Sequence, residues 1–137
     1  MNPPTNPRHH RIQAEIQAAE ASLTKARHQL MSAAGSGKES LELILEDARA
    51  RLDARREDAR HAGQRIKQWL EETKDQALDK IEDWRTDREI EKIEKEADHK
   101  EEHAVDALIV AVHALLAAEV ALAEAQKARR LAIDVAG

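Results

Sequence analysis

The 137-residue chain contains no cysteine, no phenylalanine and no tyrosine. Without cysteine it has no disulfide, no thiolate nucleophile and no cysteine-based metal site. Its only tryptophan, tyrosine or phenylalanine residues are Trp69 and Trp84, so the first 65 residues offer none of these rings for stacking on a nucleic-acid base. Because large side chains are scarce, we expect helices that pack closely over alanine or bury further surface by oligomerising.

Proline is confined to the first seven residues, where it disfavours a regular helix. We therefore predict a disordered leader over residues 1–9 and a single helical domain over residues 10–137. The leader has no apolar stretch of the kind found in signal peptides. The longest uncharged run in the second half, residues 107–118, is shorter than the roughly 20 residues that a membrane span needs. A cytoplasmic protein is the simplest expectation.

The charge pattern gives no basic surface for nucleic acid. The net charge is −5, and residues 1–65 carry 11 basic and 9 acidic side chains, whereas residues 66–137 carry 11 and 18. The basic residues of the first half alternate with acidic ones at nearly every turn, which is typical of a solvated helix surface. We therefore expect no nucleic-acid partner.

Alanine, leucine, glutamate, lysine and arginine dominate the composition, and these are strong helix formers. In residues 10–33 the apolar positions are spaced alternately by four and three, a heptad pattern that places them on one helix face. They are Ile12, Ile16, Ala19, Leu23, Ala26 and Leu30. The segment Gly35-Ser36-Gly37 then ends this helix, since glycine adopts the conformations that follow a helix end.

Two further helices are predicted over residues 39–84 and 87–134. Thr86 and Glu89 have the spacing of a capping box, which marks a helix start and would let the chain fold back on itself. The alternative is one continuous helix from about Ser40, with Gly63 as a kink or a close helix contact. The predicted fold is all-α: a long antiparallel helical hairpin or coiled-coil-like bundle of three helices, assembled as an oligomer.

The third helix is charged over residues 87–103 and apolar on most sides over residues 104–125, as in a buried helix. We expect it to form the centre of the bundle or of an oligomer interface, and we assign the assembly interface to Leu108, Val112, Leu115 and Leu116. Trp69 and Trp84 are expected as packing anchors or as exposed contact residues. Glu119 and Glu124 interrupt its apolar surface. They are expected to pair with arginine or lysine of another helix, or to form a polar site that fixes the register.

Two motifs suggest chemistry. The segment around Gly37-Lys38 lacks a phosphate loop's earlier glycine, because Ser32 occupies that position, and Glu39 stands where serine or threonine is needed. A second cluster comprises Glu96, His99, His103 and Asp106. His99, His103 and Asp106 recur every three to four residues, so they share one helix side and could hold a divalent ion. The alternative is a solvated polar face.

These observations predict a structural or protein–protein interaction module without catalysis, cofactor or small-molecule substrate. Its partner would be another copy of the chain or another helical protein. One alternative is a helical bundle that binds a divalent metal through the histidine and carboxylate face. Another is a peripheral protein of a membrane or hydrophobic granule. A membrane partner is less favoured, because the polar face of residues 101–126 carries acids where such helices carry lysine and arginine.

Overall fold

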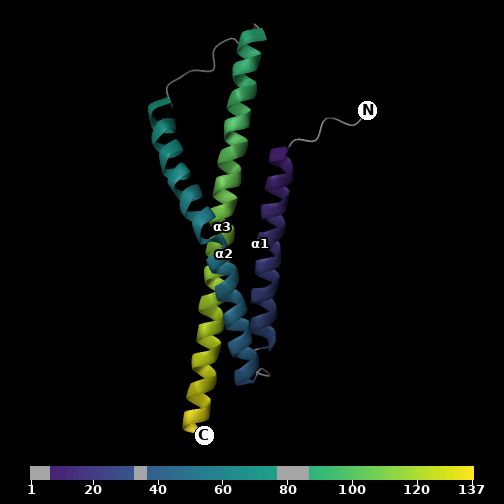
Figure 1. Cartoon of the computed structure of the whole chain (residues 1–137), viewed down its shortest axis with the longest axis vertical. Coiled ribbons are helices and arrows are strands. Elements are labelled where there is room, and N and C mark those ends of the chain that lie inside the picture. Colours follow the sequence, from purple (N-terminus) through teal and green to yellow (C-terminus); the bar gives the residue numbers. More distant parts are fainter. Residues whose placement is uncertain (1–6, 33–36, 77–86) are drawn as a thin grey trace, which may run out of the picture.

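The computed structural model describes residues 7–32, 37–76 and 87–137, and it places three helices in them. They are α1 (Pro7–Ser32), α2 (Lys38–Gln76) and α3 (Asp87–Ala136). The predicted all-α class and three-helix organisation are thus confirmed for this part of the chain. The 50 residues of α3 span about 75 Å. Figure 1 shows that the chain direction reverses from α1 to α2 and again from α2 to α3.

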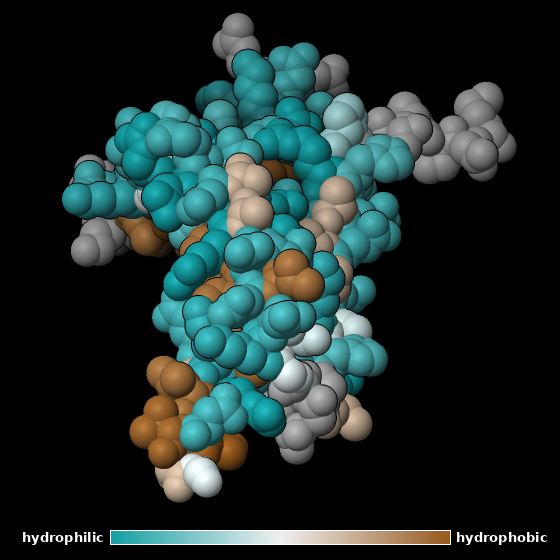
Figure 2. Space-filling view, turned by 60° about the horizontal axis from the view of Figure 1, so that its bottom comes forward, coloured by the Kyte–Doolittle hydropathy of each residue, from teal (hydrophilic) through white to brown (hydrophobic). Residues whose placement is uncertain are grey.

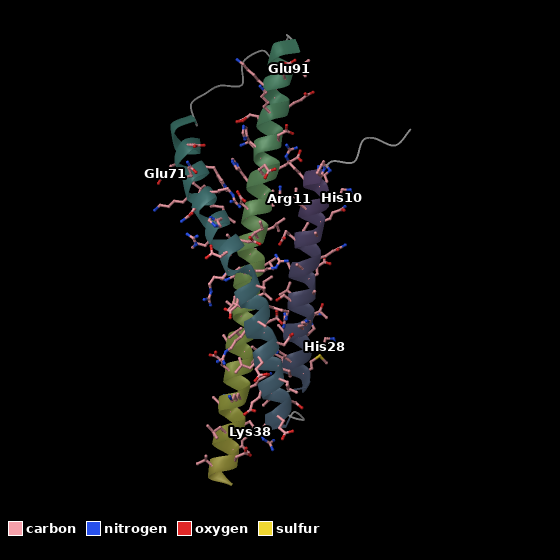
Figure 3. All side chains as sticks on the ribbon, viewed as in Figure 1. His10, Arg11, His28, Lys38, Glu71 and Glu91 are labelled. Carbon is pink, nitrogen blue, oxygen red and sulfur yellow. The ribbon has the colours of Figure 1, made fainter. Side chains whose placement is uncertain are left out.

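α3 is the central element of the arrangement. Both α1 and α2 pack along it, whereas α1 and α2 contact each other only marginally. α2 follows α3 closely in its first half, and its second half then diverges (Figure 1). Glu71 on α2 and Glu91 on α3 lie on these separated ends (Figure 3). The bundle is therefore closed at one end and open at the other.

The start of the first helix differs from the prediction, because proline was expected to exclude helix there. α1 begins at Pro7 rather than near His10, so residues 7–9 are helical and do not belong to a leader. Proline is compatible with the first turn of a helix, because its missing N–H would have no intrahelical acceptor there. At the start of α2, the N–H of Leu41 donates to the carbonyl of Gly37 over 3.1 Å, so Gly37 closes the first turn.

The predicted turn near Thr86 lies outside the described residues. α2 is described to Gln76, and α3 begins at Asp87 as expected and continues to Ala136, two residues past the predicted end. Trp84 and Thr86 lie outside the described residues. The described helices fold back on one another, so the continuous helix from Ser40 is not formed (Figure 1).

The apolar core is narrow and lies between α2 and α3. Its buried hydrophobic residues among those described are Leu41, Leu45, Ala48, Ala59, Ala62, Val105, Val112, Leu116 and Ala123. Four of these nine are alanine. Small side chains leave little apolar surface to bury, and the core therefore contributes less free energy of folding than a leucine-rich core of equal length.

α1 joins this core differently from the prediction. Its buried side chains are Ser22 and Gln29, whereas Ile16, Leu23 and Leu30 of the expected heptad face are exposed, Leu30 by 63%. The helix is turned so that polar residues meet α3. The reason lies on α3, where a buried carboxylate requires hydrogen-bond donors.

Gly63 offers a test of the α2 geometry. Apart from the backbone of its own helix, a Cβ built at Gly63 would meet no atom within 4 Å. Gly63 therefore makes no close helix contact, and no steric reason requires glycine at this position. We expect Gly63→Ala to raise the free energy of unfolding by about 0.5–1 kcal/mol, because alanine loses less backbone entropy in a helix interior. Chemical denaturation followed by circular dichroism measures this change.

The matched control is Gly37→Ala. Gly37 also has open space around its Cα, but it precedes the first helical residue, where alanine is a poor choice. This variant should not gain stability. A Gly63→Ala protein that is less stable than the parent would show that α2 bends at this position.

Candidate functional site: buried ion pairs and an open helix face

Glu119 is the point at which all three helices meet. Its side chain, on α3, is fully buried. Arg51 of α2 donates to both of its oxygens, from Nη1 to Oε2 over 2.9 Å and from Nη2 to Oε1 over 3.0 Å. Ser22 of α1 donates its hydroxyl to Oε2 over 2.6 Å. Bidentate guanidinium binding plus a third donor is the arrangement that makes a buried carboxylate tolerable.

Arg51 is itself held in place from the other side. Its Nε donates to Asp47, one turn earlier on α2, over 2.9 Å. The hydrogen bonds to Glu119 raise the pKa of the Arg51 guanidinium above its ordinary value, although partial burial opposes this. A raised pKa means that the charged form stabilises the fold at every pH below that of the free guanidinium, and this contribution is lost only in strong alkali. The Arg51 guanidinium therefore does not act as a switch at physiological pH.

A second buried carboxylate repeats the pattern closer to the open end. Asp106 of α3 is nearly fully buried and accepts from Arg65 of α2, with Nε at 3.0 Å and Nη2 at 2.8 Å from Oδ1. The hydrogen bond to Asp106 raises the pKa of Arg65. The two arginines are 14 residues apart on α2 and their acids 13 apart on α3. Both pairs thus fit one alignment of these two helices.

The sequence-based prediction for the acidic residues is confirmed. Glu119 pairs with an arginine of another helix, and so does Glu124, whose Oε1 accepts from Arg49 over 3.1 Å. The sequence did not identify which of the basic residues would serve. A buried acid on an apolar helix signals that a cation must lie opposite, but α2 alone carries several arginines with similar neighbours.

α1 is attached to α3 mainly by polar contacts. Arg8 donates to Asp98 and Glu102 at 3.2 and 3.1 Å, and Gln126 donates to the backbone carbonyl of Gln29 at 2.8 Å. Arg11 lies on the side of α1 that faces α3, and its Nη1 is 3.4 Å from Glu102 (Figure 3). These contacts, with Ser22, fix the rotation of α1 and explain the exposure of its leucines.

The four proposed metal ligands are not brought together. Asp106 is engaged by Arg65, and His103 stacks on Trp69 of α2 with ring centroids 4.4 Å apart and an interplanar angle of 13°. Glu96 and His99 are exposed. In the described parts of the chain no three histidine or acidic side chains cluster closely enough to hold a metal ion. The predicted ligands do lie on one helix, α3, but two of the four, His103 and Asp106, are engaged by residues of α2.

The expected interface residues divide into two groups. Val112 and Leu116 are buried against the chain's own helices and so lie at the centre of the bundle, one of the two places expected for them. Leu108 and Leu115 are half-buried at its margin. Trp69 is also half-buried and packs on α3, as a packing anchor does, and Trp84 lies outside the described residues.

Apolar side chains are instead exposed at the ends and on the outer face of α3. Figure 2 shows hydrophobic surface gathered where the end of α3 projects beyond α1 and α2, and Leu131, Ile133 and Val135 are exposed there. Near the other end Ile90 and Ile93 are exposed. Between them the outer face is mostly exposed alanine and includes Lys100. Hydrophobic surface of this extent is typical of an interaction site.

One open groove lies between the start of α2 and the end of α3. Its volume is about 410 Å³, and its walls mix leucines with charged residues of both signs: Leu41, Leu45, Leu131, Lys38, Arg49, Glu124, Lys127 and Asp134. Catalysis needs an acid, base or nucleophile whose pKa is adjusted in a water-excluding site. This groove is open to solvent, and we assign it no reaction.

Comparison of the chain with protein families, with curated proteins and with solved structures finds no match. The functional interpretation therefore rests on the geometry of the molecule alone.

The Arg51–Glu119 pair should dominate the stability of the fold. Arg51→Met leaves Glu119 buried with only the Ser22 hydroxyl, and we expect it to lower the free energy of unfolding by about 3 kcal/mol. Arg56→Met is the control, since Arg56 pairs with Asp53 on the solvent side of α2, and it should cost at most about 0.5 kcal/mol. Urea denaturation of both variants measures the difference.

A second substitution separates the burial cost from the pairing. The double variant Arg51→Met/Glu119→Leu removes the buried charge as well, so it should recover most of the loss. If Arg51→Met is no less stable than Arg56→Met, the buried pair does not control stability.

Proposed function

We propose that this protein is a structural, helix-binding interaction module that assembles with other copies of itself and carries no catalytic activity. In this proposal the three helices form an antiparallel, coiled-coil-like unit. The buried arginine–carboxylate pairs hold that unit in one register, and the unpartnered apolar faces bind another helix.

The observation that supports the proposal is an excess of surface. The chain exposes 10461 Å², whereas a compact monomer of 15.4 kDa is expected to expose about 7,200 Å². The exposed side chains include eleven large hydrophobic residues of the described helices, on all three of them. A monomer with a thin, alanine-rich core would leave this apolar surface in water, and association removes it.

The polar network supports assembly in a second way. Because ion pairs and hydrogen bonds fix how α1 and α2 sit on α3, the outer faces keep a constant shape. Binding to a preformed surface costs less conformational entropy than binding to helices that must first be ordered. This favours a scaffold that docks rigid helices, and it gives no reason to expect a reaction.

The mass in solution tests the proposal. We expect light scattering on a sizing column to give at least twice the 15.4 kDa of one chain at micromolar concentration. Small-angle scattering should give a length near the roughly 75 Å of α3, because pairing along the helices adds width. A monomer at concentrations up to about 100 μM would contradict self-assembly, since specific interfaces of standard size bind more tightly than this.

A second candidate function is attachment to a lipid surface. Within the described residues, the segment Ile90–Ala136 of α3 is long and apolar enough to cross a membrane by length and composition. The core helix of a water-soluble protein passes the same test. Insertion would also separate Glu119 from Arg51 or carry both into the lipid.

Liposome flotation distinguishes the two candidates. We expect the protein to stay with the soluble fraction in the presence of neutral and of anionic vesicles, because the basic residues on its exposed faces are interleaved with acidic ones and its net charge is −5. Flotation with either vesicle type would favour the lipid function over self-assembly. A basic amphipathic peptide serves as the positive control.

A further inference from the structure

A stripe of exposed apolar residues runs along α3 on the side away from α1 and α2. It starts with Ile90 and Ile93, continues through Ala97 and Lys100, and is then alanine at every position until it ends at Val135. Successive members are alternately three and four residues apart, which is the spacing of a helix–helix seam. Apart from the half-buried alanine at 104, every member is exposed. We name these residues the α3 stripe.

We propose that the α3 stripe is the contact through which two copies of the chain pair, with their α3 helices antiparallel and Ala111 of one copy opposite Ala114 of the other. The inference rests on the proposed self-assembly and names its surface, its orientation and its register. The occupant is a second copy because the stripe is complementary to itself.

The self-complementarity follows from the positions of the large residues. In the proposed register, Ile90 of one copy lies opposite Val135 of the other, and Ala107 lies opposite Ala118. Each such pair occurs twice, because a two-fold axis relates the copies. The central layers then contain only alanine, which lets two helix axes approach to about 8 Å. The bulkier residues meet only at the ends of the contact, where the helices can splay.

Charge decides between the two orientations. Lys100 is the one charged member of the stripe. Parallel, in-register pairing would place Lys100 directly against Lys100 of the second copy. Antiparallel pairing places it beside Ala125 of the second copy, next to Glu124, whose side chain is half exposed. The same register sets the exposed Glu94 against Arg129 of the second copy. Antiparallel pairing thus sets opposite charges beside each other and avoids the contact between the two Lys100 side chains.

The stripe is long enough for a stable dimer. From Ile90 to Val135 it extends over 46 residues of α3, or about 70 Å, and a helix with its side chains is about 10–12 Å wide. Each copy would therefore cover roughly 700–800 Å², close to the ~800 Å² per partner of a standard interface. The contact would also leave the Arg51–Glu119 and Arg65–Asp106 pairs undisturbed, since they lie on the opposite side of α3.

Cysteine cross-linking tests the register, because the chain has no cysteine of its own. Ala97→Cys and Ala128→Cys are prepared as separate single-cysteine proteins, and both sites are exposed. In the proposed dimer residue 97 faces residue 128 of the second copy. We therefore expect disulfide-linked dimers, seen on a non-reducing gel, when the two proteins are mixed and oxidised, and few or none with either alone. Linkage of each protein to itself would show parallel pairing and overturn the proposal.

Substitution at the centre of the stripe tests the surface. Ala114→Glu, which lies beside the two-fold axis, should raise the dimer dissociation constant at least tenfold, measured by light scattering over a dilution series. Ala54→Glu, at an exposed alanine of α2, is the matched control and should leave the constant unchanged. Circular dichroism checks that both remain helical, as expected for glutamate at exposed helix positions.

The remaining outcomes separate this inference from the proposed function. If Ala114→Glu remains dimeric and Leu23→Glu on α1 dissociates, self-assembly stands and the α3 stripe is the wrong surface. If the parent protein is monomeric throughout, both proposals fail. If that monomer floats with liposomes and Ala114→Glu does not, the stripe binds lipid and no second copy occupies it.

Discussion

The buried carboxylate of Glu119 is the constraint on which the arrangement of the helices depends. A charge removed from water must be paired and hydrogen-bonded, and Glu119 obtains these partners from both other helices, Arg51 on α2 and Ser22 on α1. A shift of α2 by seven residues would put Ile44 or Asp58 in the place of Arg51, leaving a buried charge unpaired or facing a like charge. The alanine-rich core would resist such a shift only weakly, so the ion pair is what selects one register.

This way of fixing the register has a consequence for the surface. α1 presents Ser22 and Gln29 to α3, and its larger apolar residues, such as Leu23, consequently face solvent. Over its central part, α3 buries Val112, Leu116 and the acids Asp106 and Glu119 on the side that meets α1 and α2, and the opposite side is mostly alanine. The internal structure is thus specified by polar contacts, while much of the hydrophobic surface stays available for a partner. A stable fold and an adhesive exterior arise from the same distribution of residues.

Several features could be read from periodicity and composition because they depend on neighbours in the sequence. The helical class, the start of a helix just after Gly37 and the start of α3 at Asp87 are features of this kind, and the structure agrees with them. The pairing of Glu119 with a cation was also predictable, since it follows from the cost of burying a charge. The assignment of His103 to a metal site was not supported, because its stacking partner, Trp69, is 34 residues distant and nothing in the local pattern identifies it.

By itself, then, the sequence determined the helical class, the approximate helix boundaries and the need for cations opposite the acids of the third helix. These follow from local propensity and from the energetics of single side chains. The tertiary structure alone decided which arginine meets which acid and how α1 is rotated. It also decided that Val112 and Leu116 lie in the core while most alanines of the α3 stripe are exposed. A helix that is apolar on most sides has no preferred inner face in its own sequence. The face becomes fixed only when partners from other helices satisfy the buried charges of Asp106 and Glu119.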